Sequence, residues 1–330
     1  VETARVSLPD APTLTYFEFT ALAIMRFFAA AKLDAVILEV GMGGRLDAIN
    51  VLDADCAIVT SIDIDHAAFL GDTREKIARE KAGVFRANAI AVCGDPMPPA
   101  SLVDYAESLG CDLWLMGRDY NFQGDKQQWA WSGRGKRFSG LGYPALRGAN
   151  QLLNASAVIA ALSALRDRIP VSAQDIRNGF ALVELPGRFQ VLPGQPTIVL
   201  DVAHNPHAAA TLGQGLDKMG YHPYTYAIFG AMADKDIEGV IRPMVGVVDH
   251  WFCTDLPTSR AASASELTHI LEGAGVKRDQ GQDGGIQTFA SPGEAYQKAL
   301  LSAGEGDRIV VFGSFYTVAG VMAYRNNQAH

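Results

Sequence analysis

Continuous apolar runs alternate with helical patterns along the first third of the chain. Residues 35–40 (AVILEV), 56–62 (CAIVTSI) and 89–93 (AIAVC) have the pattern of parallel strands that are buried on both faces. Residues 74–85 form a polar helical stretch, and 16–32 carry apolar residues nearly all round, which predicts a buried helix. This alternation predicts βαβ units and a doubly wound, mostly parallel sheet.

The pattern changes between residues 112 and 196. Short aromatic stretches separated by glycine turns over 112–142 predict a small antiparallel patch. Two helices are predicted over 150–168 and 172–183. Residues 184–196 (ELPGRFQVLPGQP) contain three prolines and two glycines, which makes this stretch the best linker candidate in the chain.

Beyond that stretch the alternation of strands and helices resumes, which predicts a second, smaller α/β domain. The predicted strands are 197–202, 224–231, 250–254, 286–289 and 308–314, and the predicted helices are 206–218, 236–245, 263–273, 292–302 and 315–325. We therefore predict a central domain over residues 1–186 and a C-terminal domain over residues 187–330.

The composition indicates a cytoplasmic globular protein, which we expect to be a monomer although the sequence does not reveal the oligomeric state. The chain has 330 residues, of which 48% are hydrophobic, and a net charge of −8, which argues against a nucleic-acid partner. The four cysteines are far apart with no CxxC pair, so they are expected to be reduced, buried thiols without zinc or disulfides. No apolar run reaches the roughly 18 residues that a membrane span needs, so no membrane partner is expected.

Three glycines follow the first apolar run in LEVGMGGRLDAIN (38–50). A phosphate-binding P-loop would continue with Lys and Ser or Thr after its last glycine, but Arg45, Leu46 and Asp47 follow here. The third glycine of a dinucleotide fingerprint is also missing, and the motif GxxxxGK[ST] occurs nowhere in the chain. The loop is therefore not predicted to cradle a triphosphate.

Two ligand candidates are predicted at neighbouring strand ends. Glu39 lies at the end of the first predicted strand, and His66 follows the second in TSIDIDHAAFLG, just after Asp63 and Asp65. The carboxyl edge of an open α/β sheet is where ligands bind, and a carboxylate with an imidazole suits a Mg²⁺ shared with phosphates. Alternatively, Glu39 caps a turn through backbone N–H groups and His66 is structural. Lys81, considered alone, is a solvated surface lysine.

Seven motifs together resemble the folylpolyglutamate synthase/dihydrofolate synthase family, which are ATP-dependent amide ligases of the Mur type. They occur in family order and are LTYFEF (14–19), LEVGMGGRLDAIN (38–50), TSIDIDHAAFLG (60–71), REKAGVF (79–85), LPGRFQ (185–190), DVAHNPHA (201–208) and VFGSFYTV (311–318). The resemblance implies a Mur-ligase-like central ATPase domain, N-terminally incomplete here, and a smaller Rossmann-like C-terminal domain.

The resemblance also implies roles for individual residues. Glu39 and His66 match Mg²⁺ ligands, and Lys81 matches a lysine that carries a CO₂-derived carbamate and helps to hold a second Mg²⁺. The residues that match the pterin pocket are Thr15, Tyr16, Phe17, Glu18, Leu46, Asp47 and Ala48. The residues that match ATP contacts are Asn154, Arg188 and Asp201, with Asp201 on the ribose. His204 would lie near the phosphates, and Ser314 and Tyr316 are candidates for the glutamate site.

Structural roles remain open for several of these residues. Arg188 could bridge the domains by hydrogen bonds, Asp201 could cap the helix near residue 206, and Ser314 could cap the helix that follows it. Ile49 and Ala67 stand where the family usually has threonine, beside the site, which puts fine substrate preference in doubt.

The implied reaction adds L-glutamate to dihydropteroate and to the γ-carboxylate of folates through an acyl phosphate, with ATP as co-substrate. Two alternatives stay open, a Mur ligase of cell-wall synthesis and an inactive, truncated homologue that binds a pterin. The family's P-loop lies upstream of the motifs found here. The chain is therefore expected to begin inside a longer protein, and without that segment to be unable to turn over ATP.

Overall fold

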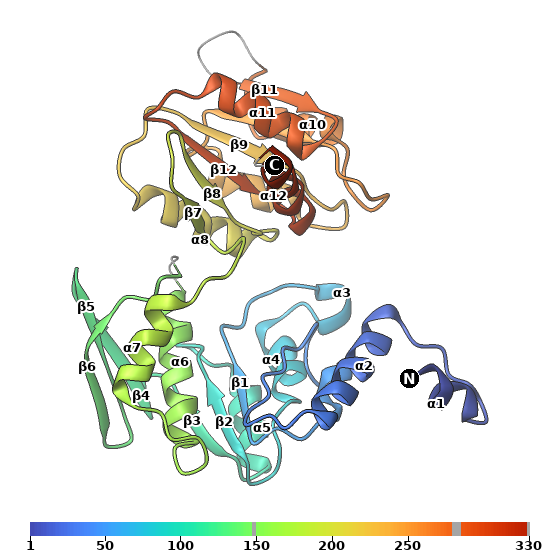
Figure 1. The fold of residues 1–330 in the computed structure, drawn as a ribbon, viewed down its shortest axis with the longest axis vertical. Coiled ribbons are helices and arrows are strands. Elements are labelled where there is room, and N and C mark those ends of the chain that lie inside the picture. Colours follow the sequence, from blue (N-terminus) through green and yellow to red (C-terminus); the bar gives the residue numbers. More distant parts are fainter. Residues whose placement is uncertain (147–149, 279–284, 329–330) are drawn as a thin grey trace. The chain divides into compact units, whose positions relative to one another are not determined.

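The computed structural model describes residues 1–146, 150–278 and 285–328 (Figure 1). Its contacts divide the chain into two compact units. One unit holds residues 1–123, 130–139 and 156–171, and the other holds residues 124–129, 140–155 and 172–330. The first unit contains a parallel sheet and the second a mostly parallel sheet, each with helices against it. The domain boundary between residues 186 and 187 stays a prediction.

The sheet of the first unit has three parallel strands in the order β1-β2-β3. They are β1 (Cys56–Val59), β2 (Ile90–Cys93) and β3 (Asp112–Leu115). The strands predicted at 56–62 and 89–93 are confirmed, whereas 112–115 extends the parallel sheet rather than opening the predicted patch. A separate three-stranded sheet follows, in the order β4-β5-β6, from β4 (Tyr120–Gly124), β5 (Gln128–Gly133) and β6 (Lys136–Gly142).

Two helices cover one face of the parallel sheet. These are α4 (Arg74–Ala82) and α5 (Ala100–Ser108), whose side chains Ile77 and Leu102 are fully buried against the strands. The helices predicted over 150–168 and 172–183 are confirmed as α6 (Gln151–Ala164) and α7 (Ala173–Leu182). A Cβ on Gly94, just after β2, would lie 3.3 Å from Cβ of Ala157, so α6 passes close to the carboxyl ends of these strands.

The strand predicted at 35–40 does not form. The backbone there is irregular, and Ile37 is 95% exposed. A strand needs a neighbour to pair its N–H and C=O groups, and among the described strands β1 pairs only with β2. The apolar pattern of residues 35–40 indicates a preference for burial. Among the described residues, however, no strand pairs with this segment.

The helix predicted at 16–32 forms as α2 (Tyr16–Ala30), but the prediction that it is buried is wrong. Ala21 is its one buried residue, and Phe27 is 74% exposed. Its neighbour in the fold is the short 3-10 helix η1 (Ala48–Val51), which covers little of its apolar surface. Two further short helices, α1 (Glu2–Ser7) and α3 (Ala67–Leu70), complete this region.

The second unit is built on a six-stranded sheet in the order β11-β10-β9-β12-β8-β7. Its strands are β7 (Gln190–Leu192), β8 (Thr197–Leu200), β9 (Thr225–Phe229), β10 (His250–Thr254), β11 (Gly285–Phe289) and β12 (Arg308–Phe312). All pair in parallel except β7, which runs antiparallel to β8. The five strands predicted after residue 196 are therefore confirmed. The linker prediction is wrong at its end, because residues 190–192 form an edge strand.

Helices cover both faces of this sheet. They are α8 (Pro206–Asp217), α9 (Ile237–Ile241), η2 (Arg242–Met244), α10 (Ala264–Gly273), α11 (Pro292–Ser302) and α12 (Phe315–Gln328). Successive strand residues enter different cores: Phe229 packs with α8, α9 and α10, while Ile228 packs with α11 and α12. This alternation explains the continuous apolar runs, because both faces of each strand are buried.

The four cysteines are free thiols, and the prediction that they are buried is confirmed for two of them. Cys93 and Cys253 are buried, whereas Cys56 and Cys111 are only partly so. Burial raises the pKa of the Cys93 thiol to about 11, which keeps it protonated and unreactive at neutral pH. Within the described parts of the chain, no helix has the length and apolar character that a bilayer crossing requires.

Candidate active site

The glycines of the loop at 41–44 allow it to pack tightly against neighbouring segments. Gly43 has φ of +69°, and a Cβ there would lie 2.7 Å from the Leu70 side chain. A Cβ on Gly44 would lie 2.9 Å from the backbone oxygen of Lys81, at the end of α4. Side chains do not fit at such distances, so Gly43 allows close packing on α3 and Gly44 allows close packing on α4.

Asp47 organises the same loop. Its carboxylate accepts hydrogen bonds from the N–H groups of Gly41 (3.1 Å), Met42 (3.0 Å) and Ile49 (2.9 Å). The turn is therefore capped by Asp47 and not by Glu39, which was the structural alternative for Glu39. Glu39 is exposed and belongs to an irregular segment, so its predicted place at a strand end is wrong. Its carboxylate is accessible to a cation.

Phe17 connects α2 to the loop. A Cβ on Gly41 would lie 2.9 Å from Cζ of the Phe17 ring, so the ring rests on the glycine. Tyr16 and Leu46 are 88% and 80% exposed, and Ala48 begins η1. The structure thus brings the Phe17 ring against the loop that carries residues 46–48, with apolar surface left open beside it.

Thr15 and Glu18 form the N-terminal cap of α2. The Thr15 hydroxyl accepts the Glu18 N–H (3.2 Å), and the Glu18 carboxylate accepts the Thr15 N–H (2.7 Å). This reciprocal arrangement is a capping box and fixes the start of the helix. Both residues therefore have a structural role next to Phe17.

His66 lies in a strained backbone conformation beyond β1. Its φ and ψ are 51° and 40°, the left-handed region, and its N–H donates to the Asp65 carboxylate at 2.8 Å. Its Nε2 is 3.9 Å from the same carboxylate. Residues other than glycine rarely adopt this conformation, and those that do cluster at functional sites. The ligand role of His66 stays a prediction.

Lys81 lies in the last turn of α4, near this histidine loop. Burial lowers the pKa of the Lys81 ammonium, and the negative charge of Asp65 acts in the opposite direction. The structure therefore brings Lys81 within electrostatic reach of Asp65, the neighbour of His66. No group of three or more His, Cys, Asp or Glu side chains able to hold a metal occurs among residues 1–146, 150–278 and 285–328. Few protein ligands suit Mg²⁺, which keeps waters and substrate oxygens in its shell.

An ion pair between the buried Asp95 and the half-buried Arg74, which the sequence analysis missed, holds the start of the histidine loop. Asp95 is 3% exposed and accepts hydrogen bonds from Ile62 N–H (2.7 Å) and from Arg74 Nη2 (2.8 Å). Arg74 Nε in turn donates to the Ile62 carbonyl at 2.9 Å. The N–H and the carbonyl of Ile62 are thus both hydrogen-bonded to the Arg74–Asp95 pair. Asp95 closely follows β2, and the strand-end reasoning used for His66 could have found it.

In the second unit, Asp201 holds the turn that carries Arg188. Its carboxylate accepts the N–H groups of Phe189 (2.8 Å) and Ala203 (2.7 Å). Burial raises the pKa of the Asp201 carboxyl, while these two hydrogen bonds and the charges of Arg188 and His204 act against that rise. Asp201 is therefore a partly desolvated carboxylate beside two cationic or ionisable side chains.

Phe315 lies next to both of those side chains and was also missed. The Arg188 guanidinium carbon is 5.5 Å from the centre of the Phe315 ring, and the His204 ring is 6.3 Å from it. Phe315 is 58% exposed, which is unusual for a phenylalanine that has packing partners. Its position between Ser314 and Tyr316 in the motif VFGSFYTV was the available signal.

Asp201 and Ser314 were each expected, as an alternative to a binding role, to cap the helix that follows, and the structure gives a different answer for each. Asn205, and not Asp201, caps α8, by accepting the Ala208 N–H at 2.8 Å. Ser314 is buried, and its hydroxyl accepts the Tyr316 N–H at 3.1 Å, as expected of a residue that caps α12. Tyr316 is 46% exposed. Asn154 is exposed on α6.

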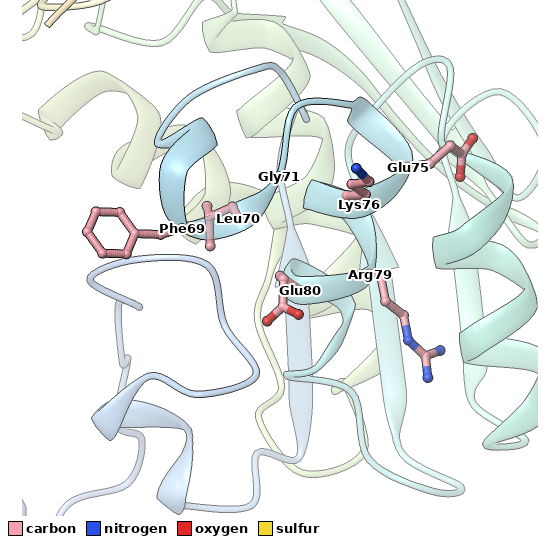
Figure 2. Close-up of a pocket in the computed structure, with 7 residues that line it drawn as sticks. All are labelled: Phe69, Leu70, Gly71, Glu75, Lys76, Arg79 and Glu80. Carbon is pink, nitrogen blue, oxygen red and sulfur yellow. The ribbon is translucent and has the colours of Figure 1, made fainter.

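An open hollow of about 470 Å³ lies along α3 and α4 (Figure 2). It is lined by Phe69, Leu70, Gly71, Glu75, Lys76, Arg79 and Glu80. Leu70 also touches the glycine loop, but Glu39 and His66 are not among the lining residues. The hollow therefore borders the candidate site and does not contain it.

Family comparisons match both halves of the chain. The Mur ligase middle domain matches residues 3–162, and the Mur ligase glutamate ligase domain matches residues 187–315. The dihydrofolate synthase/folylpolyglutamate synthase of Escherichia coli (strain K12) is 39% identical over 322 residues, which are 98% of this chain and 71% of that protein. The Haemophilus influenzae enzyme of the same description is 39% identical over 325 residues, covering 93% of this chain and 72% of that protein.

Solved structures agree in fold. E. coli FolC in complex with DHPP and ADP has a TM-score of 0.88 at 38% identity, and the match covers 96% of this chain and 72% of that chain. A bifunctional folylpolyglutamate synthase/dihydrofolate synthase with Mn, AMPPNP and L-glutamate bound has a TM-score of 0.84 at 40% identity. This match covers 95% of this chain and 72% of that chain.

Proposed function

The chain belongs to the dihydrofolate synthase/folylpolyglutamate synthase family of Mur ligases, ATP-dependent enzymes that attach glutamate through a new C–N bond, and from that premise we propose how its residues serve the reaction. The substrates are ATP, L-glutamate, and either dihydropteroate or a folate with a free γ-carboxylate. The observation that carries the proposal is the packing of the glycine loop on α4, which links residues 46–48 to Lys81.

The chemistry proceeds in two steps. The substrate carboxylate attacks the γ-phosphate of ATP, which forms an acyl phosphate and releases ADP. The amine of glutamate then attacks the acyl carbon, and the tetrahedral intermediate breaks its C–O bond to release phosphate. Phosphoryl transfer of this kind depends mainly on positioning and on charge neutralisation.

Glu39 and His66 are the proposed Mg²⁺ ligands, with Lys81 as a carbamate for a second ion. The donor types suit Mg²⁺, since Glu39 is an exposed carboxylate residue and His66 stands beside the carboxylate of Asp65. When bound, Mg²⁺ neutralises charge on the phosphates. The lowered pKa of Lys81 favours the neutral amine, which is the form that reacts with CO₂.

Arg188, Asp201 and Asn154 are proposed to bind ATP, and His204 to lie near its phosphates. His204 Nδ1 is 3.0 Å from the Val202 carbonyl, which can only accept, so Nδ1 carries the proton. A neutral His204 ring then has Nε2 free as an acceptor, able to take a proton from the attacking amine. Ser314 and Tyr316 are proposed for the glutamate site.

Lys81 gives a direct test of the carbamate. We expect Lys81→Ala to lose most activity, because the anionic ligand is removed, and to regain part of it when small carboxylic acids are supplied. Lys81→Arg keeps a cation but cannot be carbamylated, so it should be equally weak. The measurement is ADP release with and without bicarbonate. Full activity of Lys81→Ala in bicarbonate-free buffer would refute the role.

The substrate class is tested by binding. The full-length gene product is titrated with dihydropteroate and, separately, with a UDP-muramyl substrate of cell-wall ligases. Binding of dihydropteroate alone supports the proposal. Binding of the UDP-muramyl substrate alone would favour the cell-wall alternative.

A further inference from the structure

The side chains of Arg45 and Glu80 are joined by a two-pronged ion pair. Arg45 Nε lies 3.1 Å from each Glu80 carboxylate oxygen, and Arg45 Nη2 lies 3.0 Å from Oε1. The main chains are joined as well, since Arg45 N–H donates to the Glu80 carbonyl at 2.9 Å. Paired guanidinium–carboxylate bonds fix orientation as well as distance. Residue 45 of the loop is therefore tied to α4 through both its side chain and its backbone.

A second set of contacts fixes the far end of the loop to the segment just after α4. Asn50 Nδ2 donates to the Gly83 carbonyl at 3.0 Å, and Arg86 Nη2 donates to the Asn50 carbonyl at 2.7 Å. Gly83 also packs so closely on Arg45 that a Cβ there would lie 2.4 Å from Cβ of Arg45. Residues 46–48 are therefore held at both ends, through Arg45 and through Asn50, by contacts with the segment that carries Lys81.

The Arg45–Glu80 pair is too exposed to be explained by stability. The Arg45 and Glu80 side chains are 49% and 25% exposed. Ion pairs with this exposure contribute about 0–1 kcal/mol to folding. In sequence, however, Arg45 immediately precedes Leu46 and Glu80 immediately precedes Lys81. The pair therefore sets the distance between two groups to which the proposed function assigns substrate and metal contacts. Figure 2 shows Glu80 extending from the C-terminal part of α4.

We propose that Arg45 and Glu80 are a positioning pair for the ligation reaction. They touch neither substrate nor metal themselves, but hold the loop of residues 46–48 in register with Lys81. This role rests on the proposed function. A displacement of about 1 Å between reacting groups can lower a rate about 100-fold, so a pair with little effect on folding can have a large effect on catalysis.

The test uses the full-length gene product and the variant Arg45→Gln. We expect KM for dihydropteroate to rise and kcat to fall, so that kcat/KM drops about 10–100-fold, the effect of losing an outer-shell partner. KM for ATP should stay near the wild-type value. Mn²⁺ affinity should weaken, and amide hydrogens of residues 41–50 should exchange faster, because the loop is released from α4.

Two further variants separate positioning from folding. Exchanging the charges, with Arg45→Glu and Glu80→Arg together, should recover part of the lost kcat/KM, since it rebuilds the pair. Lys76→Gln is the matched control, because it breaks the exposed 2.8 Å pair between Lys76 and Asp72 next to the same helix without touching the loop. It should keep wild-type kinetics and wild-type exchange at residues 41–50.

The possible results separate a failure of the proposed function from a failure of the positioning role of Arg45 and Glu80. Wild-type protein without glutamate-dependent turnover would overturn the proposed function and this role with it. Active wild type together with an Arg45→Gln variant of unchanged kcat/KM would overturn the positioning role alone. A drop in kcat/KM with unchanged exchange at 41–50 would also overturn it, because the loop would not have been released.

Discussion

Replacing His66 with alanine is expected to lower turnover by about 1,000-fold while leaving dihydropteroate binding largely intact. A metal ligand contributes several kcal/mol to the transition state, and about 4 kcal/mol corresponds to that factor. The proposed pterin contacts belong to other residues, those at the start of α2 and in the glycine loop. The measurement is steady-state ADP release, together with dihydropteroate titration of the same variant.

A second variant is needed because the backbone of His66 adopts the left-handed conformation, which alanine disfavours. Alanine disfavours the left-handed region, whereas asparagine adopts it more readily, so His66→Asn removes the imidazole with less strain on the loop. It should be nearly as inactive as His66→Ala. His269→Ala, an exposed histidine on α10, is the control and should keep full turnover. High activity of His66→Asn would show that the backbone, and not the imidazole, is what the reaction needs.

Replacing Asp95 with alanine is expected to lower the free energy of unfolding of the first unit by about 1–3 kcal/mol, the usual cost of leaving a buried backbone donor without its acceptor, because the Arg74 side chain is 36% exposed and water can solvate its charge. Arg74 would lose its carboxylate, and the Ile62 N–H would lose its acceptor. Because Ile62 begins the segment that leads to His66, turnover should fall as well. The midpoint of urea unfolding, followed by circular dichroism, measures the stability.

An exposed aspartate of the same unit provides the comparison. Asp72→Ala removes the partner of Lys76, and both side chains are more than half exposed. Its expected cost is about 0–1 kcal/mol. If Asp95→Ala proved no more destabilising than Asp72→Ala, the ion pair would not be what holds the histidine loop.

The strands of the second unit could be predicted closely because their burial is encoded locally. β9 and β12 are buried at every position, since helices cover both faces of the sheet, and continuous apolar runs result. Residues 35–40 have the same local pattern but no strand partner among the described residues. An apolar sequence pattern indicates only that a segment prefers burial. Whether the segment becomes a strand depends on hydrogen bonding to a neighbouring strand.

The candidate site could be predicted in part, for a similar reason. His66 and Asp201 lie in motifs whose local context marks them. The Arg45–Glu80 pair joins residues 35 positions apart, and the Arg74–Asp95 pair joins residues 21 apart, so no local pattern reveals either of them. Glu39 was identified through its motif, but the reasoning from a strand end was wrong because the strand does not form.

The central claim is that this chain belongs to a ligase that joins glutamate to a pteroate or folate. The most direct measurement is ADP release by the full-length gene product with ATP, Mg²⁺, L-glutamate and dihydropteroate, with the product examined by mass spectrometry. The account predicts ADP release that requires both L-glutamate and dihydropteroate, and a product that carries one added glutamyl residue. ADP release that requires a UDP-muramyl substrate instead, with no glutamyl product from dihydropteroate or folates, would contradict it.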